Sequence, residues 1–232
     1  MPDDVKTRLM QAAKAHVVFD GWSDATFNAA ARECDMTPEA ARAICPNGAV
    51  DLAEAFHKAG DAGLADWALT ADLSALRYSE KVTELVWRRL MLAEDKELVR
   101  RGMTLFSMPQ HSARGAALIW GTADTIWQAL GDTSDDLNWY SKRAILSGVY
   151  GASVVFWLGD HSAEHADTRA FIERRIANVM QFEKLKGQVR SNKALAPLTD
   201  LIDAFSGRVR APGRDPRPDY PGWVNPKGDA AK

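Results

Sequence analysis

Hydrophobic residues recur through most of this chain at spacings of three and four, the pattern of one buried face on an α-helix. The clearest case is a helix expected from Leu137 to about Leu158. Its inner face should consist of five residues at helical spacing: Leu146, Val149, Tyr150, Ser153 and Trp157. No segment has the alternation that is typical of a strand, so the sequence predicts an all-α protein.

Local start and stop signals divide the rest of the chain into further helices. Ser23 or Asp24 can cap one helix, and Thr37 followed by Pro38 can open the next, because a short side-chain oxygen accepts the free amide protons of a first turn. The other expected helices are Val5–Phe19, Ser23–Cys34, Thr37–Cys45, one that begins near Ala49, Leu73–Ala93, Lys96–Met108, His111–Leu130 and Glu164 to about Lys186.

The first sixty residues have the order and lengths of a helix-turn-helix module of the kind found in TetR-type regulators. They carry six basic and nine acidic residues, a balance of −3. The helix in the place of a recognition helix, Thr37–Cys45, offers one Arg and one Glu among alanines. A DNA reader needs Lys and Arg to neutralise phosphates and to reach base edges. We therefore expect a helix-turn-helix module that has lost DNA binding, and no nucleic-acid partner. The alternative is a TetR-type transcriptional regulator that responds to a lipid-like effector.

The composition is that of a globular protein with a substantial core. Of the 232 residues, 46% are hydrophobic and 26% are charged, and the net charge is −2. Cys34 and Cys45 show no metal or redox spacing, which predicts free thiols in a reducing compartment. No apolar run is long enough to span a bilayer, and the first residues have no signal or transit pattern.

No catalytic motif stands out, so the sequence predicts a protein that is not an enzyme. The phosphate-binding, dinucleotide-binding, hydrolase and zinc-protease signatures are all missing. His161 and His165 are four residues apart beside Asp160 and Glu164, but a third committed ligand is not nearby. We expect no metal and no cofactor.

The start of the Leu137–Leu158 helix carries large side chains close together. In one interpretation Trp139 packs inward and Arg143 forms a salt bridge with Asp136 or Asp135. In the other, an exposed patch of Asp, Trp, Tyr and Arg binds a partner, because aromatic residues and Arg are enriched at binding hot spots. The residues of this patch are Asp136, Leu137, Trp139, Tyr140 and Arg143.

The same stretch resembles a known family. The chain reads DTSDDLNWYSKRAILSGVY, then DTRAFIERRIANVM and GQVRS, which is similar to the ninth Coq protein family of ubiquinone biosynthesis. The resemblance is strong from about Thr133 to Asn192 and extends from Arg8 to Arg210. It implies a non-enzymatic lipid-binding protein with a TetR-regulator-like helical fold that partners the di-iron demethoxyubiquinone hydroxylase. The chain lacks paired Glu-x-x-His motifs, so it is not the hydroxylase itself.

The resemblance also bears on the middle of the chain, where small residues stand beside large aromatic ones. This composition allows either close helix packing or a cavity between helices. If the helices pack closely, the protein is a structural dimer that binds no ligand. The family favours the second, with an apolar tunnel for an isoprenoid lipid. The expected lining residues are Met103, Phe106, Leu118, Trp120, Val149, Phe156 and Trp157.

The C-terminal part has a different character. Residues 184–210 carry six basic and two acidic residues, a balance of +4, around an apolar helical stripe. This segment either packs on the domain or lies in a membrane interface, and the family favours the membrane. The expected membrane contacts are Leu195, Leu198, Leu201, Ile202 and Phe205. Residues 211–232 hold five of the ten prolines and should be disordered.

These expectations combine into one arrangement. An N-terminal helix-turn-helix-like module (1–60) is followed by a lipid-binding and dimerisation body (61–192), an amphipathic membrane helix (193–210) and a tail (211–232). The terminal helix pair should form a two-fold homodimer. The expected location is the bacterial cytoplasm, peripheral on the inner membrane, because mitochondrial relatives would need a presequence.

Overall fold

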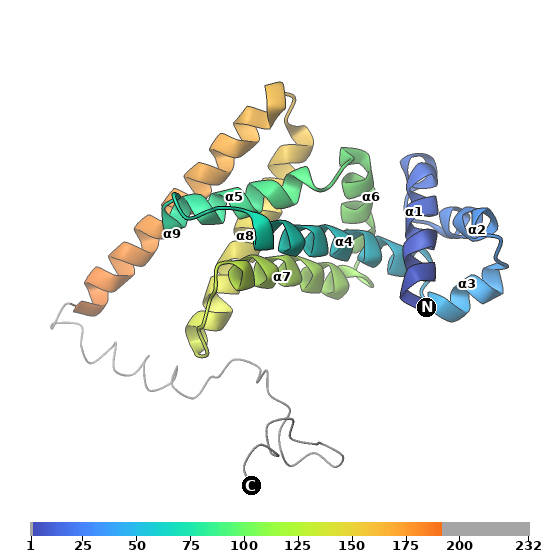
Figure 1. Ribbon diagram of the computed structural model, residues 1–232, viewed down its shortest axis with the longest axis horizontal. Helices are drawn as coiled ribbons and strands as arrows, with labels where there is room; N and C mark the ends of the chain where they lie inside the picture. The colour runs from blue at the N-terminus through green and yellow to red at the C-terminus, as the bar shows by residue number, and fades with distance from the viewer. Residues whose placement is uncertain (1, 192–232) are drawn as a thin grey trace, which may run out of the picture.

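The computed structural model describes residues 2–191, which form nine α-helices and one short 3-10 helix, without a strand (Figure 1). The order is α1 (Pro2–Asp20), α2 (Asp24–Glu33), α3 (Pro38–Ile44), α4 (Ala49–Thr70), α5 (Tyr78–Met91), α6 (Lys96–Ser107), α7 (Ser112–Ala129), α8 (Leu137–Gly159), η1 (Ala163–His165) and α9 (Ala166–Ser191). The predicted all-α class is confirmed.

Most helix starts are set by local capping, as expected. Ser23 accepts a hydrogen bond from the backbone N–H of Thr26, and Thr37 accepts one from Ala40. Asp136 caps α8 by accepting from the backbone N–H of Asn138. These short-range bonds satisfy amide groups that have no partner inside the helix.

Two helices begin later than the apolar pattern predicts. The expected start at Leu73 is wrong, because α5 opens at Tyr78, where the Glu80 carboxylate accepts the backbone N–H of Arg77 and closes the first turn. The expected start at Glu164 is also wrong, because Glu164 has a positive φ of 51° and belongs to the short 3-10 turn before α9. Both starts are therefore set by local backbone and polar contacts that the spacing of apolar residues does not report.

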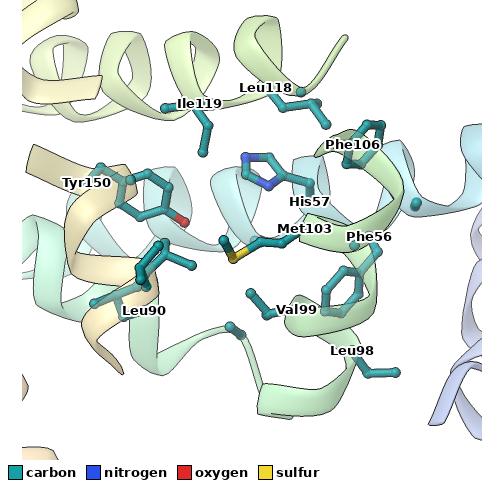
Figure 2. Close-up of a pocket in the computed structure, with 18 of the residues that line it drawn as sticks. Phe56, His57, Leu90, Leu98, Val99, Met103, Phe106, Leu118, Ile119 and Tyr150 are labelled. Atoms are coloured by element: carbon teal, nitrogen blue, oxygen red, sulfur yellow. The ribbon is translucent and has the colours of Figure 1, made fainter. Parts of the chain in front are cut away.

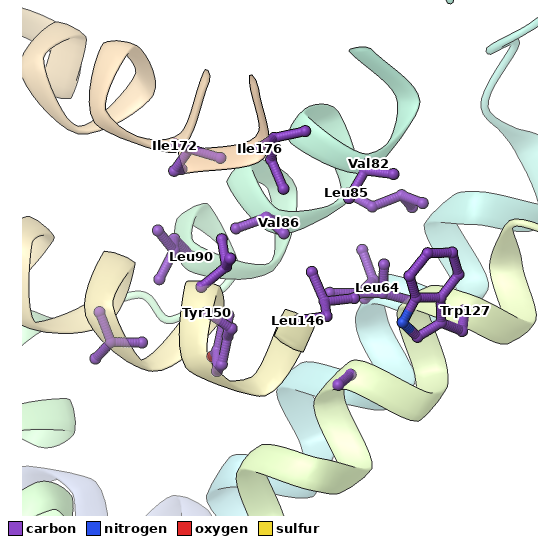
Figure 3. Close-up of a cluster of buried hydrophobic side chains, with 14 of the residues drawn as sticks. Leu64, Val82, Leu85, Val86, Leu90, Trp127, Leu146, Tyr150, Ile172 and Ile176 are labelled. Atoms are coloured by element: carbon purple, nitrogen blue, oxygen red, sulfur yellow. The ribbon is translucent and has the colours of Figure 1, made fainter. Parts of the chain in front are cut away.

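The buried side chains form two clusters. The N-terminal cluster joins α1–α3 and the start of α4, and Leu98 and Leu105 of α6 complete it. The body cluster joins α4, α5, α7, α8 and α9 (Figure 3). Helix α4 runs unbroken across residue 60 and contributes to both clusters, whereas α1–α3 lie at one end of the molecule (Figure 1). The division of the chain at residue 60 stays a prediction.

Helix α8 is the element around which the body is built. It packs against α7 and α9, and its predicted inner face of five residues is buried throughout. Ile172 and Ile176 of α9 meet this core beside Leu90 and Val86 of α5 (Figure 3). No helix in residues 2–191 is both long enough and apolar enough to cross a membrane.

Candidate functional site: a lipid-sized cavity and an aromatic platform

A cavity of about 410 Å³ lies among helices α4, α5, α6, α7 and α8 (Figure 2). Its surface is mainly aliphatic and aromatic. The side chains that define it include Phe56, Leu90, Val99, Met103, Phe106, Leu118, Ile119, Val154 and Trp157. Sites for small molecules commonly have volumes of about 300–1,000 Å³, so the cavity accommodates a drug-sized portion of an apolar ligand.

The exposure of the lining residues locates an opening. Met103 is 39% exposed and Val155 is 58% exposed, and Ala116 on α7 is exposed as well. In contrast, Leu90, Tyr150 and Trp157 of the same lining are buried. The mouth is therefore formed by α6, α7 and α8, and the deep end lies against α4 and α5.

Four of the seven predicted lining residues line this cavity: Met103, Phe106, Leu118 and Trp157. The other three do not. Trp120 turns to the aromatic residues at the start of α8, at 5.9 Å from Trp139 between ring centroids. Val149 lines a separate cavity of about 210 Å³ between α5, α7, α8 and α9. Phe156 is 36% exposed and stacks on Phe171 at 4.4 Å.

One wall of the cavity is polar. His57, Arg89 and Tyr150 line it, and Asp61 and Thr122 stand behind them. His57 Nε2 lies 2.8 Å from Thr122 Oγ1, which donates to Asp61 Oδ1 at 2.8 Å. Arg89 Nε donates to the same carboxylate oxygen at 2.7 Å, and Arg89 Nη2 donates to the His57 carbonyl at 2.8 Å. The five side chains form one network from four helices.

The network has no net charge at neutral pH. Burial, followed by the nearby Arg89 guanidinium, lowers the pKa of His57 to about 4, so the imidazole is neutral. Burial raises the pKa of Tyr150, which keeps its hydroxyl protonated. Arg89 is 4% exposed and its charge is balanced by Asp61. Gly60 permits this position, since a Cβ there would meet the guanidinium at 2.6 Å.

Sequence reasoning missed the polar wall. Its members are spread over four helices, and His57 and Thr122 are 65 residues apart. The available signal was a His and an Asp four residues apart on α4, which bring two polar groups to the face that also holds Ala53 and Leu64.

The second feature is an aromatic platform, made of Trp120, Trp139 and Tyr140. Trp139 and Tyr140 meet edge to face at 4.8 Å between centroids, and Tyr140 lies 6.4 Å from Trp120. All three side chains are half-buried, whereas Asp136 and Leu137 beside them are exposed. The platform joins α7 to the first turns of α8.

Arg143 lies beneath this platform rather than on it. The expectation of an exposed Arg143 is wrong, because its side chain is 0% exposed. Its predicted salt bridge with Asp135 or Asp136 is also wrong. The guanidinium instead contacts Asp124 Oδ1 at 2.7 Å and Asp132 Oδ2 at 3.1 Å, and lies 4.0 Å from the centroid of the Trp139 ring.

Asp132 is the anchor of this ion cluster. Burial raises its pKa, but hydrogen bonds from Lys142, Ser134 and Arg143 outweigh burial and hold the pKa at about 2. Lys142 Nζ donates to Asp132 at 2.7 Å. The carboxylate is therefore ionised at neutral pH and fixes the loop before α8 to the helix itself.

Three further expectations concern a metal site, the recognition helix and the membrane contacts. Among residues 2–191 no group of three potential ligands is placed to hold a metal, and Asp160 beside His165 accepts hydrogen bonds from Ser162 and Thr168. Arg42, on the helix in the recognition position, pairs with Asp24 at 2.9 Å. The proposed membrane contacts, Leu195, Leu198, Leu201, Ile202 and Phe205, lie outside the described residues, as does the tail.

Part of the chain is similar in sequence to proteins of ubiquinone biosynthesis. Residues 112–183 match the family model described as COQ9. The chain is 26% identical over 210 residues to the probable ubiquinone biosynthesis protein coq9, mitochondrial, of Dictyostelium discoideum, which covers 85% of this chain and 67% of that protein. It is 32% identical over 91 residues to the ubiquinone biosynthesis protein COQ9, mitochondrial, of Rattus norvegicus, which covers 39% of this chain and 29% of the relative.

The matched part of the rat protein is thus less than a third of its length. Among solved structures, a TetR transcriptional regulator from Nitrosomonas europaea superposes with a TM-score of 0.61 at 17% identity, covering 74% of this chain and 95% of that one. At this identity the likeness concerns the fold, and the predicted TetR-like architecture is confirmed.

Proposed function

We propose that this chain, whose residues 112–183 match the COQ9 family model, is a non-enzymatic accessory protein of ubiquinone biosynthesis. In this proposal it binds an isoprenoid quinone precursor at a membrane surface. It then presents this lipid to the di-iron demethoxyubiquinone hydroxylase.

The observation that carries the proposal is the cavity of about 410 Å³, whose lining is mainly apolar. An isoprenoid chain in water orders solvent around a large apolar surface, and transfer into such a cavity removes that surface from water. The protein then replaces the bilayer as the solvent of the chain. The mouth between α6, α7 and α8 lets the rest of a long chain extend outside.

The aromatic platform supports the partner part of the proposal. Trp139 and Tyr140 are half-buried and adjoin exposed Asp136 and Leu137. Rigid aromatic rings beside polar residues are typical of the centre of a protein interface. The buried ion cluster of Arg143 fixes these rings before any partner arrives, so docking costs little side-chain entropy.

Membrane attachment rests on the sequence pattern of residues 193–210, whose basic residues suit anionic headgroups. We place the protein on the cytoplasmic face of the inner membrane as a homodimer built on the terminal helices. A regulator is the weaker proposal, because the N-terminal module is acidic and Arg42 is engaged with Asp24.

The proposal is tested by hydroxylase turnover of a prenylated substrate embedded in vesicles. Wild-type chain should raise the rate. Ala116→Trp, which obstructs the cavity mouth, should remove that stimulation, whereas Ala62→Trp at an exposed position of α4 outside the cavity lining should retain it. Equal stimulation by both variants would contradict the carrier function.

A further inference from the structure

The cavity has two chemically different ends, which is informative about the ligand. The mouth residues Met103, Ala116 and Val155 are apolar, whereas His57, Arg89 and Tyr150 meet at the inner wall. Figure 2 shows the His57 ring and the Tyr150 hydroxyl pointing into the same space. A purely hydrocarbon ligand could form no hydrogen bond with either group, whereas a ligand that carries oxygen atoms could.

The charged members of the wall are already balanced. Asp61 accepts hydrogen bonds from Arg89 at 2.7 Å and from Thr122 at 2.8 Å. Arg89 spends a second N–H on the His57 carbonyl, and its guanidinium is held against the backbone of α4 at Gly60. A carboxylate or phosphate brought to this wall would find no uncompensated cation and would lose its hydration.

The groups that face the cavity are instead a neutral imidazole and a phenol. A phenol can donate and accept. Because the Thr122 hydroxyl donates to Asp61, His57 Nε2 donates to Thr122, and the neutral imidazole offers Nδ1 to a ligand as an acceptor. A carbonyl, a hydroxyl or an ether oxygen on a ring can accept from the phenol, and a ring hydroxyl can also donate to the imidazole. The surrounding Leu90, Leu118 and Ile119 provide an apolar cover for the ring itself.

From this geometry we infer that the wall formed by His57, Arg89 and Tyr150 binds the uncharged, oxygen-bearing ring of the lipid, so the ligand enters head first. The inference rests on the proposed carrier function and adds to it the orientation and the head-group class. The isoprenoid chain then leaves through the mouth between α6, α7 and α8. A ring held at the inner wall is protected in the carrier, and its release is a step separate from partner docking.

The test measures the affinity of the full-length protein for three probes with one prenyl chain, by titration calorimetry. The chain is attached to a benzoquinone, to an unsubstituted benzene or to a benzoate. Wild-type protein should bind the quinone about five- to ten-fold more tightly than the benzene, the worth of one or two hydrogen bonds. It should bind the benzoate most weakly.

One substitution and a control locate the effect. Tyr150→Phe removes the hydroxyl that donates to the quinone, so it should reduce affinity for the prenylated quinone toward that for the prenylated benzene and leave the benzene affinity unchanged. Tyr78→Phe makes the same chemical change on an exposed side chain outside this cavity and should alter neither.

The possible results distinguish failure of the head-group assignment from failure of the carrier function. Equal binding of quinone and benzene, unaffected by Tyr150→Phe, would overturn the head-group assignment and leave the apolar carrier standing. Tightest binding of the benzoate would overturn the uncharged class. Failure of all three probes to bind would contradict the carrier function itself.

Discussion

Two buried arginines organise this molecule, and they support opposite kinds of surface. Arg89 of α5 pairs with Asp61 of α4 and stands in the wall of an internal cavity. Arg143 of α8 pairs with Asp124 and Asp132 and lies under an external aromatic platform. In both places carboxylates neutralise the guanidinium charge. Each ion pair therefore serves to hold neighbouring uncharged groups in position.

The difference lies in what each pair holds in place. Arg89 fixes the backbone of His57 and, through Asp61, the hydroxyl of Thr122. Arg143 instead stacks against the Trp139 ring and ties α8 to α7 and to the preceding loop. Loss of the first pair should therefore affect ligand binding, and loss of the second should affect the outer surface and the stability of the fold.

The largest expected effect is that of Arg143→Met. Removal of the guanidinium takes away the ion-pair partner of Asp124 and one of the two cationic partners of buried Asp132, which should lower the free energy of unfolding by about 3–5 kcal/mol. Urea denaturation measures this quantity. Arg77→Met removes an arginine whose side chain is 83% exposed and should lower the free energy of unfolding far less, because exposed ion pairs are screened by water. Equal effects would show that burial of Arg143 does not matter.

The next effect is a pH dependence that arises at the cavity wall. The pKa of His57 in the folded protein, about 4, lies below its unfolded value of 6.5, so protons bind the unfolded chain first as the pH falls. The stability contributed by neutral His57 is full above pH 6.5 and should be lost progressively between pH 6.5 and 4, by about 3 kcal/mol. The free energy of unfolding, measured by urea denaturation across this pH range, should change less with pH in His57→Gln than in the wild-type protein.

The platform should give the smallest of the three effects. Trp139→Ala should weaken binding to the hydroxylase by about 2 kcal/mol, or roughly thirty-fold in Kd, because aromatic side chains at an interface centre carry much of the affinity. Helical content by circular dichroism should stay unchanged. Trp67→Ala on α4, outside the platform, should leave partner binding intact, and equal weakening by both would remove the assignment of the platform.

The sequence was sufficient to predict most of the fold, because helix starts depend on neighbours in the chain. Ser23 and Thr37 cap their helices as expected from side-chain chemistry alone. The start of α5 was misplaced because the cap between Arg77 and Glu80 competes with nearby leucines.

The site was predictable only in part, because it depends on which helices face each other. Periodicity identifies an apolar face of α7 or α8, but does not reveal which neighbour covers it. Trp120 and Phe156 were therefore expected to line the cavity, but they contact Trp139 and Phe171 instead. The partners of Arg143 were also mistaken, because Asp136 is already used to cap α8 and Asp132 returns from the loop.

The most direct test of the carrier function is organic extraction of the purified protein, followed by mass spectrometry of the extracted lipid. The wild-type protein should yield an isoprenoid quinone or its precursor, which should be lost in Ala116→Trp but not in Ala62→Trp. An empty wild-type protein, or one that yields bulk phospholipid alone, would contradict the claim that the cavity carries a quinone lipid.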